Sequence, residues 1–565
     1  MPAGSRSSHA VGGGPIPIHP ARQSATAHAD ATGVRKPKPD AGIHRWIAPV
    51  TGHSDEEHEM TSILRSGHRR PRLCHAVALI AALLVVPVPV IAAQATAGPA
   101  EQVDHYLQMQ MDKLRIPGLA VAVVKDGRVV LTRNYGIASV EFAQPVREDT
   151  VFAINSVTKA FTGVAAMRLV QEGRLDLVAP VARYLGDLPI AWRGITIRQL
   201  LSHMSGLPDV MRAPTVETDA AAAWAWTQQQ AVVFPPGQRF SYCQTNYTLI
   251  QRVINTIEGR PLDSTLADDQ LRLADMTRTF YGDAYDVIPQ KAPTYRWVKP
   301  ALPVDGRSGV ASDAPRVMKA ASERFQPFRR ASSALNSTAA DLAQWLITID
   351  TGRMLTPQAR ETMWTPVTFA SGEKGQWGLG WQVLARGSHR AVGMTGGGRA
   401  AVFVYPQDRV GVVILTNLAG SYPEDMVDKV ASLYAPGLPL TGVPALRIAL
   451  EEQGYDRAQQ AAAAIEAKDK TLTWSETELN DWGYRLLSTE HAGDALAIFQ
   501  LAVKKFPRSA NAEDSLAQAY RAIGDSDAAA LHYRRVLQFH PGHAGALRQL
   551  AELKQSIDNE PSTTR

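Results

Sequence analysis

At residues 154–162 the chain reads Ile154-Asn155-Ser156-Val157-Thr158-Lys159-Ala160-Phe161-Thr162. This stretch places the hydroxyl of Ser156 and the amine of Lys159 three residues apart, so on a helix the two side chains share one face. A serine hydroxyl is a poor nucleophile at neutral pH, but a desolvated lysine beside it can accept its proton once burial has lowered the pKa of the amine. Taken alone, the Ser-x-x-Lys string also fits an ordinary pair on a helix surface, so its surroundings decide the interpretation.

Further blocks follow this stretch in a definite order. An amphipathic segment ends near Gly173, and three more blocks lie downstream: the segment 195–208, which contains Ser202-His203-Met204-Ser205-Gly206; Phe240-Ser241-Tyr242-Cys243-Gln244-Thr245-Asn246-Tyr247; and Gly393-Met394-Thr395-Gly396-Gly397. Ser-x-x-Lys is the acylation motif of penicillin-binding proteins and β-lactamases. In this order and spacing, the blocks resemble the serine hydrolases of the β-lactamase superfamily over residues 100–436. The resemblance is to the branch of class C β-lactamases, esterases and D-aminopeptidases.

The resemblance implies the catalytic residues. Ser156 is the expected nucleophile of an acyl transfer, and Lys159 and Tyr242 are the expected bases. A phenol near a lysine ammonium loses its proton more easily, so Tyr242 can relay a proton between Ser156 and the leaving group. For Tyr242 the alternative is a buried aromatic ring whose hydroxyl has found a partner.

A second group of residues is expected to hold the developing oxyanion. Ser156 begins a helix, so its own backbone amide can donate to that oxygen. The resemblance assigns the second donor to the amide of Gly397, which follows Thr395 and Gly396. Consecutive glycines at 396–398 allow the backbone to pass close to a substrate, although the same run also fits a flexible turn.

The chain departs from the family pattern at two positions. Gln244 stands where the Tyr-x-Asn motif has Asn, and its amide lies one methylene further out, so its contacts to Lys159 and to a substrate need a shifted backbone or a water. Met394 stands where the family usually has the Lys or His that pairs with a substrate carboxylate, and a thioether cannot do this. Arg399 offers a charge in the adjoining turn, but an arginine there is typically solvated. The substitution at 394 favours esters or neutral amides over β-lactams.

Strand patterns at both ends of residues 96–436 predict the fold. Apolar runs flank the turn Asp126-Gly127, which is typical of a hairpin, and a second pair of runs covers 400–405 and 410–416. Between these ends the chain is mostly helical and loop-like. These patterns predict an antiparallel sheet built from both ends of the domain, with a helical region inserted. The resemblance implies the same arrangement, an α/β fold with a β-lactamase/transpeptidase-like antiparallel sheet and flanking and inserted helices. The resemblance puts the active site between the sheet and the inserted helical part.

The last hundred residues contain an internal repeat. Six positions recur 34 residues later: Gly483, Leu486, Ala495, Phe499, Ala502 and Pro507 become Ala517, Tyr520, Ala529, Tyr533, Val536 and Pro541. This period resembles the tetratricopeptide repeat. We expect a helical linker at 437–475, a C-terminal α-helical repeat module at 476–555 and a disordered tail at 556–565. Such helix pairs need a docking partner, which is the preceding helices, the catalytic domain or another protein.

The N-terminal region reads as a disordered segment followed by an export signal. Residues 1–59 lack apolar periodicity and look disordered. From Met60, arginines precede an apolar run at 76–93, which ends in the cleavage-site pattern Ala93-Gln94-Ala95. We therefore interpret 60–95 as a signal peptide, Met60 as the true start and 1–59 as a gene-model extension. The alternative is a membrane anchor, but Pro87 and Pro89 interrupt a run already near the lower length limit for a spanning helix.

Composition and charge exclude several kinds of partner and site. The formal net charge is +5, but most of this excess precedes residue 96, so the basic balance is no argument for a nucleic-acid partner. Only Cys243 remains after cleavage of the signal, which excludes a disulfide within one mature chain. The histidines show no metal-ligand spacing, His203 is expected to satisfy backbone groups in a loop, and no cofactor is implied.

These patterns predict a periplasmic or secreted serine hydrolase without a stable membrane span. It would act through an acyl-enzyme on a small ester or peptide-like substrate, with a protein partner as a further option through the repeats. A β-lactamase or D-alanyl-D-alanine peptidase is the alternative within enzymes. A catalytically weak penicillin-binding-like scaffold that works through its repeats is the alternative outside them, and intact Ser156, Lys159 and Tyr242 argue against it.

Overall fold

The computed structural model describes residues 98–299 and 315–559. All of these residues belong to one compact unit of the chain. The predicted signal peptide at 60–95 and the extension at 1–59 lie outside the described residues, as does the end of the predicted tail. Within the two described ranges, no helix combines the length and apolar character that a membrane crossing requires.

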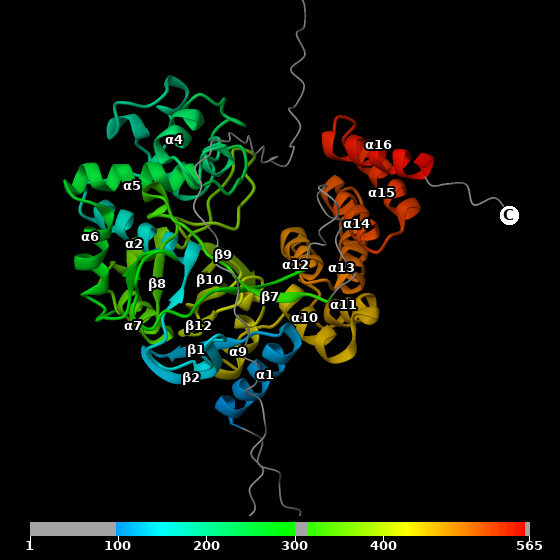
Figure 1. Ribbon diagram of the computed structural model, residues 1–565, viewed down its shortest axis with the longest axis horizontal. Helices are drawn as coiled ribbons and strands as arrows, with labels where there is room; N and C mark the ends of the chain where they lie inside the picture. The colour runs from blue at the N-terminus through cyan, green and yellow to red at the C-terminus, as the bar shows by residue number, and fades with distance from the viewer. Residues whose placement is uncertain (1–97, 300–314, 560–565) are drawn as a thin grey trace, which may run out of the picture. The chain divides into compact units, whose positions relative to one another are not determined.

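A seven-stranded antiparallel sheet forms the centre of the domain, in the order β3-β2-β1-β12-β11-β10-β9. Its strands are β1 (Gly118–Lys125), β2 (Arg128–Ser139), β3 (Gln144–Pro145), β9 (Gln382–Arg386), β10 (His389–Gly396), β11 (Ala400–Tyr405) and β12 (Val410–Thr416). β1 pairs with β12 in a register that sets Val121 opposite Ile414. The two ends of the domain therefore meet in one sheet, as the sequence predicts, with β1 and β2 beside β12 in Figure 1.

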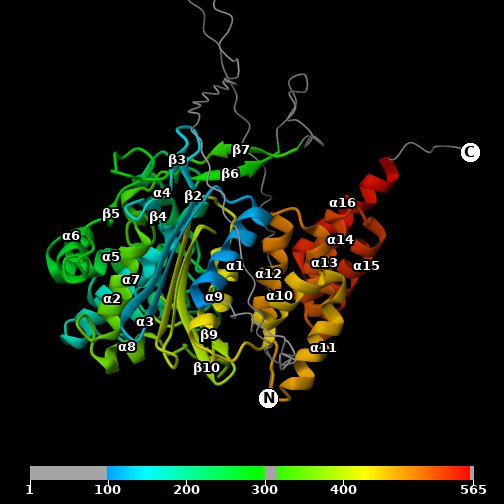
Figure 2. The ribbon, with the colours of Figure 1, turned by 90° about the horizontal axis from the view of Figure 1, so that it is seen from below.

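Helices cover both faces of this sheet, as Figure 2 shows edge-on. One face carries α1 (Pro99–Leu114) and α9 (Val427–Tyr434), which pack with the odd-numbered side chains of β1 such as Val121 and Val123. The other face carries α2 (Thr158–Gln171) and α7 (Ala339–Asp350), which pack with Ala120 and Ala122. Because successive side chains of a strand point to opposite faces, an uninterrupted apolar strand is what a sheet covered on both faces requires.

The segment between β3 and β9 holds the inserted, mostly helical part. Its helices are η1 (Asn155–Val157), α2, η2 (Val181–Arg183), η3 (Ile190–Trp192), α3 (Ile197–Leu201), η4 (Val210–Arg212), α4 (Ala220–Gln228), α5 (Gln244–Glu258), α6 (Leu262–Leu266), η5 (Ala267–Leu271), η6 (Pro327–Arg329), α7 and α8 (Pro357–Met363). Short strands β4 (Phe152–Ala153), β8 (Leu335–Ser337) and β5 (Phe280–Tyr281) form one small sheet, and β6 (Tyr295–Val298) pairs with β7 (Val317–Ala320). The helix α2 is buried on nearly every side, so neighbouring residues pack around almost its whole surface.

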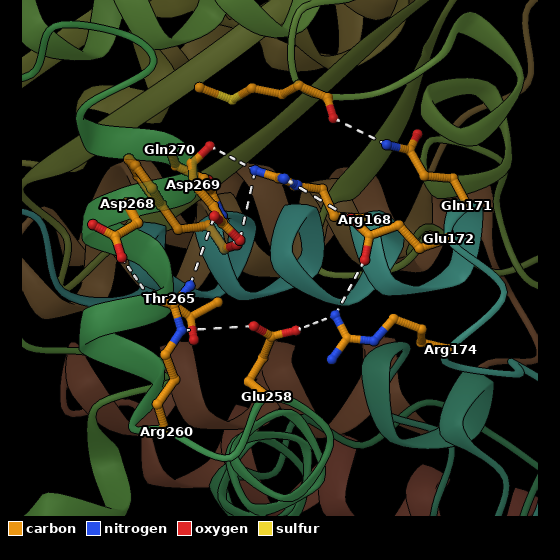
Figure 3. A network of polar contacts seen from close by, with 12 residues as sticks. Arg168, Gln171, Glu172, Arg174, Glu258, Arg260, Thr265, Asp268, Asp269 and Gln270 are labelled. Carbon is orange, nitrogen blue, oxygen red and sulfur yellow. Dashed lines mark hydrogen bonds and ion pairs between the residues drawn. The ribbon is translucent and has the colours of Figure 1, made fainter.

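A network of charges fixes the C-terminal end of α2, as Figure 3 shows. Arg168 on α2 bonds the carbonyl of Asp269 at 2.9 Å, and Arg174 just beyond α2 bonds Glu258 at the end of α5 at 2.6 Å. Arg260 in turn pairs with Asp268 and lies 3.6 Å from Glu258. Exposed pairs each contribute little free energy, but a network joining three helices restrains their relative positions.

The C-terminal region is entirely helical in its described part. It contains α10 (Gly442–Gln453), η8 (Tyr455–Arg457), α11 (Ala458–Lys468), α12 (Glu476–Ser488), α13 (Ala492–Lys505), α14 (Ala510–Ala522), α15 (Ser526–Phe539) and α16 (Ala544–Asn559). α12 and α14 begin 34 residues apart, as do α13 and α15, which matches the period of the sequence repeat. At Gly483 a Cβ atom would lie 2.5 Å from the Phe499 ring, so the glycine lets α12 and α13 approach closely.

Candidate active site

The proposed nucleophile lies where η1 passes into α2. Ser156 is the middle residue of η1, and Lys159 is the second residue of α2. The Nζ atom of Lys159 donates a hydrogen bond to the Ser156 hydroxyl at 3.2 Å. The sequence spacing therefore does produce a contact between the amine and the hydroxyl, and the amine, once neutral, can accept the serine proton.

Burial makes Lys159 a suitable base. Its side chain is fully buried, and its amine donates a second hydrogen bond to the carbonyl of Ser332 at 2.9 Å. Burial, and next the charge of Arg329, hold the pKa of Lys159 well below its ordinary value, while Asp209 and Cys243 act in the opposite direction. A lowered pKa makes the neutral amine easier to form, and only the neutral form can take a proton.

Tyr242 lies just before α5 and faces the same two groups. The Lys159 amine is 4.7 Å from the centroid of the Tyr242 ring, and Tyr242 as a residue is 36% exposed. Burial of the hydroxyl raises the pKa of Tyr242, and hydrogen bonding to Ser156 and Gln244 opposes this only in part. The expectation that the lysine eases deprotonation of the phenol is therefore wrong for this structure, because burial dominates. These pKa directions favour Lys159 as a base and Tyr242 as a proton donor.

The end of β10 forms the second wall of the site. A Cβ atom at Gly396 would lie 1.9 Å from the carbonyl oxygen of Ile154 and 3.2 Å from the Ser156 amide nitrogen, so this strand end packs directly on η1 and only glycine fits. Gly397 follows with φ +58°. In the described part of the chain, the amides of Ser156 and Gly397 have no hydrogen-bond acceptor, so both are available to an oxyanion.

The edge of β10 is open where a substrate would lie. β9 pairs with β10 from His389 only as far as Gly393, whereas β11 continues to pair through Thr395 and Gly396. On the β9 side, residues 394–396 therefore present free strand edge to the site. An extended acyl group can pair with such an edge.

Gln244 supplies an acceptor without a partner. It is the first residue of α5, and its backbone amide donates to Asp209 at 3.2 Å. Its carboxamide reaches Tyr242, while its Oε1 atom is buried and has no hydrogen-bond partner. An unpaired buried acceptor is costly unless another molecule satisfies it. The longer side chain therefore still reaches the site, and it can accept from a substrate N–H.

Met394 and Arg399 do not provide an open cation. Met394 is 2% exposed and packs in the apolar cluster that includes α2. Arg399 is 1% exposed, bonds Asn155 and pairs with Glu323, so it is not the solvated arginine that the sequence led us to expect. Its charge is compensated before any substrate arrives.

His203 packs against Tyr242 and bonds the backbone of the next residue. Its Nδ1 atom accepts from the Cys243 amide at 3.1 Å, which is the loop role expected from the sequence. Its ring lies 4.4 Å from the Tyr242 ring and 5.2 Å from Trp377. Burial lowers the pKa of His203, so it packs as a neutral ring. Within the described ranges, no group of three or more His, Cys, Asp or Glu side chains could hold a metal ion.

Three contributors to the site were missed by the sequence analysis. Ser332 contributes only a backbone carbonyl, which no side-chain pattern reveals. Asn155 and Glu323 both bond the side chain of Arg399. Asn155 lies 244 residues before Arg399 in the chain, and Glu323 lies 76 residues before it. The one available signal was Asn directly before the nucleophile, since Asn tolerates positive φ better than most residues.

The chain is similar to known proteins. The family model described as Beta-lactamase matches residues 103–435. Protein flp of Staphylococcus aureus (strain N315) is 24% identical over 346 residues, which cover 58% of this chain and 65% of that protein. A beta-lactamase of Yersinia enterocolitica is 34% identical over 149 residues, which cover 26% of this chain and 38% of that protein. The match thus spans less than two thirds of either curated relative.

Solved structures of the same fold are also similar. The octameric penicillin-binding protein homologue from Pyrococcus abyssi is 23% identical with a TM-score of 0.49, covering 60% of this chain and 78% of that one.

Proposed function

Because the chain belongs to the beta-lactamase family, we propose that it is an exported serine hydrolase that forms an acyl-enzyme on Ser156 with an ester or neutral amide substrate. The observation that carries the proposal is the 3.2 Å contact between the Ser156 hydroxyl and a fully buried lysine. Burial lowers the pKa of this lysine, so the chain holds a nucleophile and a competent base together.

The acylation step follows from the contacts of the site. Neutral Lys159 takes the proton of Ser156 as the serine oxygen attacks the substrate carbonyl. The amides of Ser156 and Gly397 donate to the resulting oxyanion. As the intermediate collapses, the bond to the leaving group breaks, and Tyr242 gives that group a proton and regains one from Lys159. Water then repeats the sequence on the acyl-enzyme and frees the acid.

The substrate class follows from the charges around the site. Met394 brings no cation, and the charge of Arg399 is already paired with Glu323. A substrate carboxylate would therefore lose the charge-assisted hydrogen bond that favours it in relatives with a lysine at this position. Neutral acyl groups lose nothing, and Gln244 Oε1 is free to accept from an amide N–H.

Labelling with two probes tests the proposal. A fluorescent fluorophosphonate and a fluorescent penicillin are applied in parallel to the wild-type protein and to Ser156→Ala. We expect the fluorophosphonate to label only the wild type, the penicillin to label it weakly, and p-nitrophenyl ester turnover to fall by several orders of magnitude in the variant. Strong labelling by penicillin would indicate a β-lactamase or peptidase. No labelling by either probe would indicate a scaffold, and normal turnover in Ser156→Ala would refute the assignment.

Export is tested separately at the N-terminus. The pattern Ala93-Gln94-Ala95 leads us to expect cleavage near Ala95. Intact mass and N-terminal sequencing of the protein from its native host measure this directly. A mature chain that still carries residues 1–59 would contradict the proposed signal peptide.

A further inference from the structure

The residue directly before the nucleophile has an unusual backbone. Asn155 has φ +42°, in the left-handed region that residues with a Cβ atom seldom adopt. This conformation sets the direction in which the next peptide unit, and so the Ser156 amide, points. Strained conformations persist at functional sites only when surrounding contacts hold them in place. Contacts around Asn155 must therefore hold its backbone at this positive φ.

Two charged side chains bind the Asn155 carboxamide on both of its ends. Its Oδ1 atom accepts from Arg399 Nη2 at 2.7 Å and from Nε at 3.2 Å. Its Nδ2 atom donates to Glu323 Oε2 at 3.1 Å. Arg399 and Glu323 are themselves ion-paired, so the three side chains form a closed triangle. Asn155 and Arg399 are buried whereas Glu323 is partly exposed, and this triangle satisfies the buried carboxamide of Asn155.

Arg399 also belongs to the turn that carries the second oxyanion donor. Its backbone amide donates to the carbonyl of Gly396 at 3.0 Å, which closes the turn containing Gly397. A Cβ atom at Gly397 would lie 3.1 Å from Asn155 Cγ and 3.3 Å from Arg399 Nη2, so the turn rests on the carboxamide itself. The backbone segments that bear the two donor amides are thus joined through one set of side chains.

We propose that Asn155, Arg399 and Glu323 form a clasp that fixes the separation and direction of the Ser156 and Gly397 amides and thereby sets the oxyanion hole. The inference rests on the proposed acyl-enzyme chemistry. Arg399 is buried beneath the turn and touches no reacting atom, so it is a positioning residue. The clasp acts on transition-state stabilisation and leaves both substrate binding and the base, Lys159, unchanged.

Substitutions in the clasp separate positioning from folding. Arg399→Lys keeps the charge but cannot hold both Asn155 and Glu323 in the same geometry. Asn155→Gly relieves the positive φ and removes only the carboxamide, so it is not expected to impair folding. In both variants we expect kcat for p-nitrophenyl butyrate to fall about 10- to 100-fold with KM nearly unchanged, since displacing one oxyanion donor costs this much or more.

The design includes a structural control and a second readout. Arg386→Lys disturbs another buried arginine, which bridges Asp428 and Glu478 away from the site, and should lower Tm without changing kcat of the folded protein. Inhibition by a phenylboronic acid, which forms a tetrahedral adduct on Ser156, should weaken in the clasp variants in parallel with kcat/KM. The acid limb of the pH profile should not move, because Lys159 is unaffected.

The outcomes distinguish this inference from the proposed function. If Ser156→Ala abolishes turnover while Arg399→Lys and Asn155→Gly retain the wild-type kcat and boronate affinity, the clasp is wrong and the nucleophile assignment stands. If the clasp variants raise KM or shift the acid limb, the contacts serve binding or the base and the inference is overturned. If Ser156→Ala stays active, the proposed function has failed first.

Discussion

At the scale of single residues, burial decides which side chains of this site can react. The same loss of hydration lowers the pKa of Lys159 and raises that of Tyr242, which suits the amine to the proposed role of base and the phenol to that of proton donor. Burial acts on the thiol of Cys243, the residue after Tyr242, in the same way as on the phenol. Burial therefore favours the proposed roles of Lys159 and Tyr242, while it makes the cysteine unreactive.

Cys243 should react slowly with thiol reagents in the native protein. It is 2% exposed, and burial raises the pKa of its thiol to about 12, so almost no thiolate is present near pH 7. Cys243→Ser should keep esterase activity and resist the slow inhibition that bulky adducts cause by obstruction. Mass spectrometry of N-ethylmaleimide adducts over time, in native and urea-unfolded protein, measures the difference. An inactive Cys243→Ser beside an active Ser156→Ala would mean that the mechanism has been misread.

Met394 should set substrate preference through the cation that it lacks. A carboxylate substrate forgoes a charge-assisted hydrogen bond of about 1.5 to 3 kcal/mol, which is roughly ten- to a hundredfold in rate. Met394→His or Met394→Lys should therefore raise kcat/KM for penicillin-like or D-alanine-terminated compounds and leave short esters nearly unchanged. Because Met394 is buried beside α2, a folding defect would show as a fall for both classes of substrate. Efficient cephalosporin hydrolysis by the wild type would contradict the argument.

At the scale of elements, the sequence predicted those parts whose signals are local. The turn at Asp126-Gly127 predicted the β1–β2 hairpin, and the apolar runs at 400–405 and 410–416 predicted β11 and β12. The helix α2 ends at Gln171, two residues before the predicted stop at Gly173. Each of these signals depends on residues close together in the chain, so no tertiary information was needed.

The contributions from distant loops could not be predicted in this way. The carbonyl of Ser332 reaches Lys159 only because the loop before β8 folds back over α2. The sequence pointed to Gln244 and Gly397 as site residues, which stays a prediction, but it gave no sign that Glu323 would pair with Arg399. A backbone carbonyl and a long-range ion pair leave no periodic pattern, and the resemblance to a family supplies only the positions of its motifs.

The element η7 (Pro423–Asp425) should make stability depend on pH. Burial raises the pKa of Glu424 from 4.5 to about 7, and its Oε2 atom has no hydrogen-bond partner. The folded state therefore binds this proton more tightly than the unfolded state does. The free energy of unfolding should fall as pH rises from about 4.5 to 7, and above pH 7 the full loss should persist.

Glu424→Gln tests this assignment. The neutral variant should have a higher Tm than the wild type at pH 8, by an amount equivalent to about 1 to 3 kcal/mol, and the two should agree at pH 4, where the glutamate is protonated in both states. Differential scanning calorimetry at both pH values gives the comparison. A difference of equal size at pH 4 would show that the substitution acts through packing and not through ionisation.

At the scale of the whole molecule, charged contacts attach the C-terminal helices to the hydrolase part. Arg386 on β9 is buried and bonds Asp428 at 2.8 Å and Glu478 of α12 at 3.0 Å. Asp425 likewise pairs with Arg447 of α10 and Arg485 of α12. The C-terminal helices therefore dock on another part of the same chain. Two repeats cannot bury their apolar faces alone, and this contact covers part of those faces. Whether their remaining faces bind another protein stays a proposal.

A chain shortened to end near Gly442 should keep most of its esterase activity and lose stability. In the described part of the chain, the hydrogen bonds of Ser156 and Lys159 involve no residue beyond 442, so the chemistry does not require the helices. Truncation leaves Arg386 with one of its two carboxylates and uncovers apolar surface, which should lower Tm and solubility. Turnover per folded molecule and Tm are the measurements, with full-length Glu478→Gln as the control that weakens the same ion pair.

One hydrogen bond links the C-terminal helices to the aromatic residues beside Tyr242. Ser475 accepts from the Gln376 side chain at 3.1 Å, and the next residue, Trp377, packs 5.7 Å from the Tyr242 ring. If this hydrogen bond positions Trp377, full-length Gln376→Ala should raise KM to the same extent as truncation does, with kcat unchanged. If the shortened chain is folded and inactive while Gln376→Ala is normal, the helices complete the active site by another route, and the separation of the two parts is refuted.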